Sequence, residues 1–250
     1  MFEKVEGIVI KSRDYGESNK ILTVFTREKG KIGVMARGAK KPINRFAALA
    51  LPMTYGYFLI QKSRGLHTLY QGETISSMRS IREDIVLTAY VAYILELLDR
   101  SVEEKKPNPF LFELLYQTIH YINEGHDPEI LTNIFEVKML EVLGLYPYVH
   151  SCVSCGKKEG SFVFSLRENG ILCSTCAPKD SYHLSVSPVA VKLFRLFYYL
   201  DLSRLGTISV KKETKQQLRS LIDAYYEEYS GIQLKSKKFL QQLSKLEGLS

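Results

Sequence analysis

The sequence has no long apolar run and no apolar leader. A membrane-spanning helix needs about 20 consecutive apolar residues, and no stretch of the 250-residue chain approaches that length. Residues 1–6 include Glu3, Lys4 and Glu6 instead of the apolar core of a signal peptide. We therefore expect a soluble protein of the cytoplasm, with enough chain for one large domain or two smaller ones.

The motifs of common nucleotide- and metal-dependent enzymes are also missing. The sequence contains no Gly-x-x-x-x-Gly-Lys-Ser/Thr phosphate loop, no His-Glu-x-x-His and no paired catalytic signature. These absences predict that the protein is not an enzyme. They leave one alternative, an enzyme whose active site carries no recognisable motif.

Cysteine is scarce, and all of it lies in one window with the spacing C-x2-C-x17-C-x2-C. This spacing is typical of a zinc site made of four thiolates. Four protein ligands leave no open position for water or substrate, so we expect one structural zinc ion. The predicted ligands are Cys152, Cys155, Cys173 and Cys176.

The residues between the two cysteine pairs predict a hairpin. Residues 162–166 and 171–172 have strand-like composition, and Asn169-Gly170 is a strong signal for a two-residue turn. We interpret residues 148–184 as a zinc ribbon. Two disulfides and a redox pair are weaker alternatives, because reduced thiols are expected in the cytosol and the context of a thioredoxin-like fold is missing. Iron stays open, since tetrahedral sulfur suits both metals.

Acidic residues are scarce in the first third of the chain. Residues 1–80 carry 14 lysines and arginines against 6 acidic residues, whereas residues 81–250 carry 20 against 21. The whole excess of the net charge of +7 therefore lies in the first third. A one-sided charge indicates a polyanionic partner, whereas a surface that serves only solubility predicts a more even spread.

Apolar alternation and regularly spaced glycines predict a small antiparallel barrel in residues 1–75. The expected strands are 5–10, 21–25, 32–36, 48–51, 53–60 and 66–70. From residue 81 the apolar period becomes helical. The expected helices lie between residue 81 and Pro107, from about Leu111 to Ile122, from Pro128 to Gly144, from Pro188 to Leu200, and near 211–229 and 236–246. We therefore predict an α+β chain with domains at 1–80 and 81–250.

Basic residues crowd one part of the predicted barrel. The cluster is Arg27, Lys29, Lys31, Arg37, Lys40, Lys41 and Arg45. Residues 37–42 follow a predicted strand and resemble a mobile basic loop. Aromatic residues lie nearby in sequence, namely Tyr15, Phe25, Phe46, Tyr55, Tyr57 and Phe58. Cations that follow a backbone, with rings that stack on bases, are typical of proteins that bind single strands without reading sequence.

The run GIVIKSRDYGESNKILTVFTREKGKIGVMARGAKKP, residues 7–42, resembles the opening of bacterial RecO proteins, a family of DNA repair and recombination mediators. The similarity continues through the helices and the cysteine ribbon. The resemblance implies an OB-fold, a helical domain with a zinc ribbon, no enzymatic active site, and a DNA-binding loop at Arg37, Lys40 and Lys41.

The resemblance also implies binding of single- and double-stranded DNA, strand annealing, and loading of RecA onto strands coated by single-strand-binding protein. The implied partners are RecR and the acidic C-terminal tail of that coating protein, and the implied location is the nucleoid. From the residues alone, an RNA- or ribosome-associated protein is the alternative, because a barrel with a zinc ribbon also suits RNA.

Overall fold

The computed structural model describes residues 1–206 and 208–247, and these form two compact units. Unit 1 joins Met1–Pro128 to the chain from Leu234 onward, and unit 2 is Glu129–Gln233. The predicted division into residues 1–80 and 81–250 separates the strands of the barrel from the helices. The two units instead group residues whose backbones contact one another, so unit 1 includes both the barrel and several helices. Among the described residues, no helix has the length and apolar character needed to cross a membrane.

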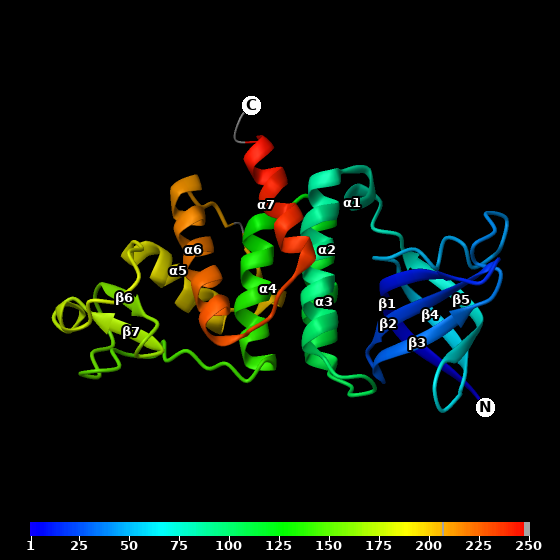
Figure 1. Cartoon of the computed structure of the whole chain (residues 1–250), viewed down its shortest axis with the longest axis horizontal. Helices are drawn as coiled ribbons and strands as arrows, with labels where there is room; N and C mark the ends of the chain where they lie inside the picture. The colour runs from blue at the N-terminus through cyan, green and yellow to red at the C-terminus, as the bar shows by residue number, and fades with distance from the viewer. Residues whose placement is uncertain (207, 248–250) are drawn as a thin grey trace. The chain divides into compact units, whose positions relative to one another are not determined.

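Five strands close into a barrel in unit 1 (Figure 1). Around the barrel they follow the order β1-β2-β3-β5-β4, and β4 pairs back onto β1. Only β3 and β5 run parallel. The strands are β1 Phe2–Tyr15, β2 Asn19–Thr26, β3 Gly30–Ala36, β4 Tyr55–Gln61 and β5 His67–Ser76. This architecture confirms the predicted barrel of the OB kind.

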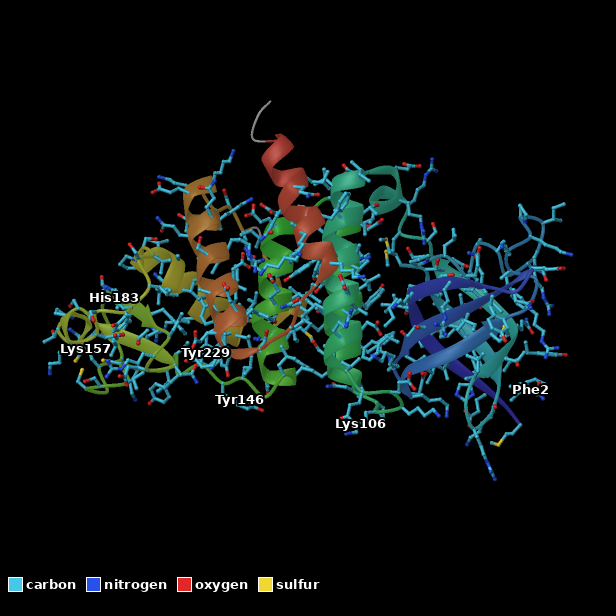
Figure 2. All side chains as sticks on the ribbon, viewed as in Figure 1. Phe2, Lys106, Tyr146, Lys157, His183 and Tyr229 are labelled. Carbon is cyan, nitrogen blue, oxygen red and sulfur yellow. The ribbon has the colours of Figure 1, made fainter. Side chains whose placement is uncertain are left out.

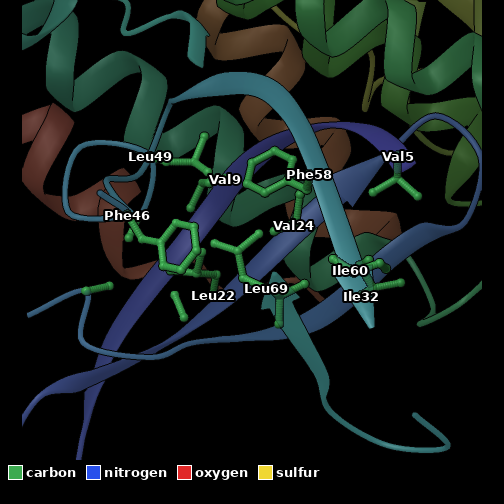
Figure 3. Close-up of a cluster of buried hydrophobic side chains, with 14 residues drawn as sticks. Val5, Val9, Leu22, Val24, Ile32, Phe46, Leu49, Phe58, Ile60 and Leu69 are labelled. Atoms are coloured by element: carbon green, nitrogen blue, oxygen red, sulfur yellow. The ribbon is translucent and has the colours of Figure 1, made fainter. Parts of the chain in front are cut away.

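Alternate residues of the strands point inward and fill the barrel with aliphatic and aromatic side chains (Figure 3). Phe58 and Ile60 enter from β4, and Leu22 and Val24 enter from β2, each fully buried. The interior is therefore a packed core and not a ligand cavity.

One predicted strand, residues 48–51, is wrong. The segment forms successive turns, with the amide of Ala50 donating to the carbonyl oxygen of Phe46 at 2.9 Å. Phe46, Leu49 and Ala50 are buried in the barrel core. Since the five strands already close the barrel, a sixth strand would find no free edge to pair with. The apolar run covers the core without joining the sheet.

The helices of unit 1 are α1 Arg79–Glu83, α2 Ile85–Ser101, α3 Pro109–Asn123 and α7 Lys235–Glu247. The first two were predicted as one helix. Asp84 separates them, because its extended backbone ends α1 and its side chain accepts hydrogen bonds from the amides of Val86 and Leu87 at the start of α2. Asn108 caps α3 in the same way.

Among the described residues, unit 2 holds three α-helices and the cysteine hairpin. The elements are α4 Pro128–Val142, β6 Phe162–Ser165, β7 Gly170–Cys173, a 3₁₀ turn at Ala177–Lys179, α5 Pro188–Tyr199, a second 3₁₀ turn at Leu202–Arg204 and α6 Lys212–Tyr229. The rings of Phe164, Phe194 and Tyr225 pack together at its centre. Glu136 of α4 is fully buried and bonds Arg219 of α6. The helix starts predicted at Pro128 and Pro188 are confirmed.

Candidate metal centre and nucleic-acid interface

The four cysteines converge on one point. Their Sγ atoms all lie within 4.8 Å of one another, and those of Cys155 and Cys173 are 3.6 Å apart. Tetrahedral zinc with Zn–S bonds of about 2.3 Å requires sulfur atoms about 3.8 Å apart. The cluster therefore has the dimensions and ligand type of a metal site.

Two tight turns and one hairpin build this cluster. In the first turn, the amide of Gly156 donates to the Cys152 carbonyl oxygen at 2.8 Å, and Gly156 has a φ of 74° that favours glycine. In the second turn, the amide of Cys176 donates to the Cys173 carbonyl oxygen at 3.0 Å. Strands β6 and β7 carry the second turn back to the first.

The hairpin turn differs from the predicted two-residue turn at Asn169-Gly170. Gly170 pairs with Ser165 inside the sheet, so the loop has four residues, 166–169. Asn169 takes the left-handed conformation, with a φ of 48°. Gly170 is required for a different reason: a Cβ there would lie 2.6 Å from the carbonyl oxygen of Tyr148. Gly170 is therefore needed because the backbone of Tyr148 lies close to it, and not because of the turn.

Backbone amides favour the thiolate form at Cys173. The amide of Cys176 lowers the pKa of the Cys173 thiol to about 6. Lys157 N–H lowers the pKa of Cys155, but hydrogen bonds with the other three cysteines outweigh it and raise that pKa to about 11. The crowded thiols share protons through their hydrogen bonds. A metal ion displaces these protons when it binds. The cluster thus fits a metal ion held by four protein ligands, with no place for substrate.

The basic cluster divides between two ends of the barrel. Arg27, Lys29 and Lys31 lie at the β2–β3 turn, and each contacts a carboxylate. Arg27 binds Glu6 and Glu113, both at 2.9 Å. Lys29 binds Glu3 at 2.6 Å, and Lys31 binds Asp99 of α2 at 3.1 Å. These three cations are engaged by acidic groups of unit 1.

Hydrogen bonds strengthen this acidic contact at Glu6. Burial acts to raise the pKa of Glu6, but hydrogen bonds from Arg27 and Tyr55 outweigh it and hold the pKa below its usual range. The Tyr55 hydroxyl donates to Glu6 Oε1 at 2.7 Å. Arg27 also lies over the ring of Phe112 of α3, 4.5 Å from its centroid. These contacts hold the β2–β3 turn against the helices.

The other four cations lie on the connection between β3 and β4. We call residues 37–45 the basic loop, and Arg37, Lys40, Lys41 and Arg45 are all exposed on it. Arg37 and Lys41 have no acidic partner among the residues that the structure describes. Lys40 contacts Asp14 at 3.2 Å. The basic loop thus presents more positive charge to solvent than its neighbours neutralise.

The backbone of the basic loop is fixed at several points. The amide of Lys40 donates to the Ser18 carbonyl oxygen at 3.0 Å, and the amide of Gly38 donates to Asn19 Oδ1 at 3.0 Å. Ala39 and Phe46 anchor the segment in the barrel core. The exposed cations therefore project from a hydrogen-bonded scaffold.

The predicted stacking rings have mixed positions. Phe25, Phe46 and Phe58 are buried, and Tyr55 is only 9% exposed, so these four belong to the core. Tyr15 is exposed, and Tyr57 is partly exposed beneath the ammonium of Lys4. Two exposed rings, Phe2 and Tyr70, were missed. The alternation in β1, which places Phe2 on the same face as Lys4, was the available signal for the first.

Comparison with known proteins gives consistent matches over the chain. The model described as "Recombination protein O N terminal" matches residues 1–78, and that described as "Recombination protein O C terminal" matches residues 82–238. Curated relatives named "DNA repair protein RecO" are 58% identical in Bacillus pumilus, 56% in Bacillus subtilis and 54% in Bacillus velezensis. Each alignment covers all of this chain, and 97%, 98% and 98% of the relative.

Proposed function

The chain belongs to the RecO family of DNA repair proteins, and on that premise we propose that it is a recombination mediator that binds and anneals single-stranded DNA without catalysing a reaction. Its proposed place of action is DNA in the cytoplasm, at the nucleoid. The proposal assigns the primary DNA contact to the basic loop on the barrel.

The observation that carries the proposal is the exposure of Arg37, Lys40, Lys41 and Arg45 on one anchored segment. A strand of DNA is a line of phosphates, and each cation that neutralises a phosphate releases condensed counterions. The three cations at the β2–β3 turn were predicted to share this role. Their contacts with carboxylates favour a structural role instead, and the experiment below separates the two.

Annealing follows from the same electrostatics. Two complementary strands repel each other, and a surface that neutralises part of their charge lowers that repulsion. Base pairing then supplies the free energy, so the proposed reaction needs no nucleotide hydrolysis. Intrinsic ATP turnover that survives repurification and changes with point mutants would overturn this part of the proposal.

The family likeness supports three further assignments. We propose that the protein loads RecA onto strands coated by single-strand-binding protein, and that its partners are RecR and the acidic tail of the coating protein. We also propose that the cysteine cluster holds one zinc ion. With four protein ligands, the ion would stabilise the ribbon and take no part in binding DNA.

A salt titration tests the basic loop. Fluorescently labelled single-stranded DNA is titrated with the wild type and with the Arg37→Ala/Lys40→Ala/Lys41→Ala variant at several salt concentrations. If about four phosphates are contacted, the slope of log affinity against log salt is about −3 in the wild type, and the variant is flatter by about two. Parallel lines would reject the basic loop as the binding site.

Binding to RNA is the competing function. The same titration with an RNA of equal length and sequence separates the two, because only a contact with the 2′-hydroxyl distinguishes RNA from DNA at a given site. Tighter binding of RNA than of DNA at every salt concentration would favour an RNA-associated function.

A further inference from the structure

Two exposed rings contact each other on the outer face of the barrel. Phe2 is 48% exposed and Tyr70 is 53% exposed, and their centroids are 4.6 Å apart. Figure 2 shows Phe2 at the surface of the barrel. Large aromatic side chains gain free energy by burial, so a contacting pair that leaves half of each ring in water offers a surface to a partner.

Tyr70 of this pair lies at a β-bulge. Along the β4–β5 ladder, Leu59 is opposite Gln71 and Ile60 is opposite Leu69, so Tyr70 is an extra residue with no partner on β4. Bulges re-aim side chains and are frequent beside binding sites. Leu69 still points into the core and is 3% exposed. Tyr70 points outward because its neighbour Leu69 points into the core, and the bulge leaves it without a partner on β4.

The basic loop supplies a cation directly beside the rings. Arg45 Nη2 donates to the carbonyl oxygen of Tyr70 at 2.8 Å, so the guanidinium is tied to the bulge. The guanidinium also lies 4.6 Å from the Phe46 ring centroid. Other donors of the exposed guanidinium remain available to a ligand. The rings and one cation of the basic loop thus form one continuous surface.

The same outer face continues across β1, β4 and β5. Lys4 of β1 is opposite Leu59, and its ammonium lies 4.0 Å from the centroid of the Tyr57 ring. Tyr57, Leu59 and Lys4 also line a shallow pocket of about 170 Å³ with Gln71, Gly72 and Glu73. The face combines flat apolar surface with positive charge, which complements a strand that has exposed bases and a phosphate backbone.

We propose that Phe2 and Tyr70 form a base-stacking subsite for single-stranded nucleic acid whose phosphates are held by Arg45 and the basic loop. This inference rests on the proposed function. A single strand can present the faces of its bases to the rings, whereas a duplex keeps them stacked. The subsite would therefore favour single strands over duplexes, a preference that the basic loop alone does not supply.

The test removes the two rings from the protein and, separately, the bases from the oligonucleotide. Binding of a labelled oligonucleotide is compared with binding of an abasic oligonucleotide of equal length, for the wild type and the Phe2→Leu/Tyr70→Leu variant. Leucine keeps the apolar contact between the two positions. We expect the variant to bind the normal oligonucleotide about tenfold more weakly, because each stacked base contributes about one power of ten. Its affinity for the abasic strand and its salt slope stay unchanged.

Two control variants separate stacking from other effects. Tyr70→Phe keeps the ring and should retain the wild-type affinity. Phe110→Leu removes a ring that is 68% exposed at the start of α3, away from the basic loop in sequence, and should have no effect on either oligonucleotide. A loss of affinity with Phe110→Leu equal to that of the double variant would contradict the assignment to Phe2 and Tyr70.

The outcomes distinguish this inference from the proposed function. Unchanged affinity of the double variant for the normal oligonucleotide would overturn the subsite, and so would an equal loss for the normal and abasic strands. Either result leaves the proposed function standing if the triple variant of the basic loop still flattens the salt slope. If that slope is also unchanged, the assignment of DNA binding to the basic loop fails as well.

Discussion

The cysteine hairpin brings four like side chains together, whereas strand β3 keeps basic side chains apart. The hairpin reverses the chain, so four sulfurs separated by up to 24 positions lie within 4.8 Å. Strand β3 is extended, so Lys31 near its start and Arg37 just after its end are about 20 Å apart. A hairpin can focus its side chains on a single ion, whereas a strand distributes them between two sites.

The difference in geometry becomes a difference in role. At the β2–β3 turn, the cations meet Glu3, Glu6 and Asp99 and hold parts of unit 1 together. On the basic loop, the cations face solvent. Cations that are neighbours in sequence are therefore paired with carboxylates at one end of the barrel and exposed to solvent at the other.

The largest expected effect is at the cluster of four cysteines. Cys173→Ser, or a strong chelator, should abolish hydrogen-exchange protection in residues 148–184, because structural zinc contributes about 10 kcal/mol or more to folding of small zinc domains. Affinity for single-stranded DNA should stay within a few-fold of the wild type. The matched control is Ser174→Ala, an exposed neighbour. A disulfide-bonded ribbon without metal in elemental analysis would refute the zinc assignment.

A smaller effect is expected at the paired end of β3. Lys31→Ala leaves Asp99 without its closest cation, since the Lys31 side chain is 12% exposed and contacts Asp99 at 3.1 Å. We expect a loss of about 1–3 kcal/mol in the free energy of unfolding, measured with urea. The salt slope of DNA binding should not change.

Lys41→Ala is the matched variant on the basic loop. It should leave stability almost unchanged and should reduce the salt dependence of DNA binding. Its exposed side chain has no acidic partner in the described part of the chain, so stability should change by less than about 0.5 kcal/mol. The salt slope should flatten by about 0.7. If Lys31→Ala and Lys41→Ala flattened the slope equally, the contrast between the two ends of the barrel would be wrong.

The smallest expected effect concerns the one ion pair that the basic loop forms with the described residues, Lys40–Asp14. Asp14→Asn removes the carboxylate that contacts Lys40 at 3.2 Å and Lys20 at 3.1 Å. Exposed pairs of this kind contribute little to stability. We expect affinity for single-stranded DNA to rise by a few-fold at low salt, with a control of Glu17→Gln on the adjacent turn. A fall in affinity would show that Asp14 orients Lys40 and does not compete with DNA.

Local patterns predicted most of the fold. The alternation in β1, β2 and β3 and the Ser187-Pro188 helix start each depend on near neighbours in sequence, and the structure confirms them. The predicted strand at 48–51 failed because its residues are apolar enough for a strand, while the closed barrel offers no free edge. The long helix predicted from residue 81 failed because Asp84 satisfies two amides as a cap.

The candidate site was predictable only where its geometry is local. The cysteine spacing predicts a cluster that could hold a metal ion, since two tight turns and a hairpin need no distant residue. The charges of Arg27 and Lys31 are equally clear in sequence, but their partners Glu113 and Asp99 lie about 70 to 90 positions away. The alternation in β5 places Tyr70 outward, but its contact with Phe2 depends on the pairing of distant strands, which no local pattern reveals.

The return of α7 to unit 1 determines when that unit can be completed. Glu96 of α2 accepts hydrogen bonds from the amides of Lys235 and Ser236 at the start of α7, and these residues follow unit 2 in sequence. During synthesis, all of unit 2 leaves the ribosome before α7 emerges. Unit 2 can therefore finish folding before unit 1 acquires its last helix. The part of the chain that is synthesised first is the last to be completed.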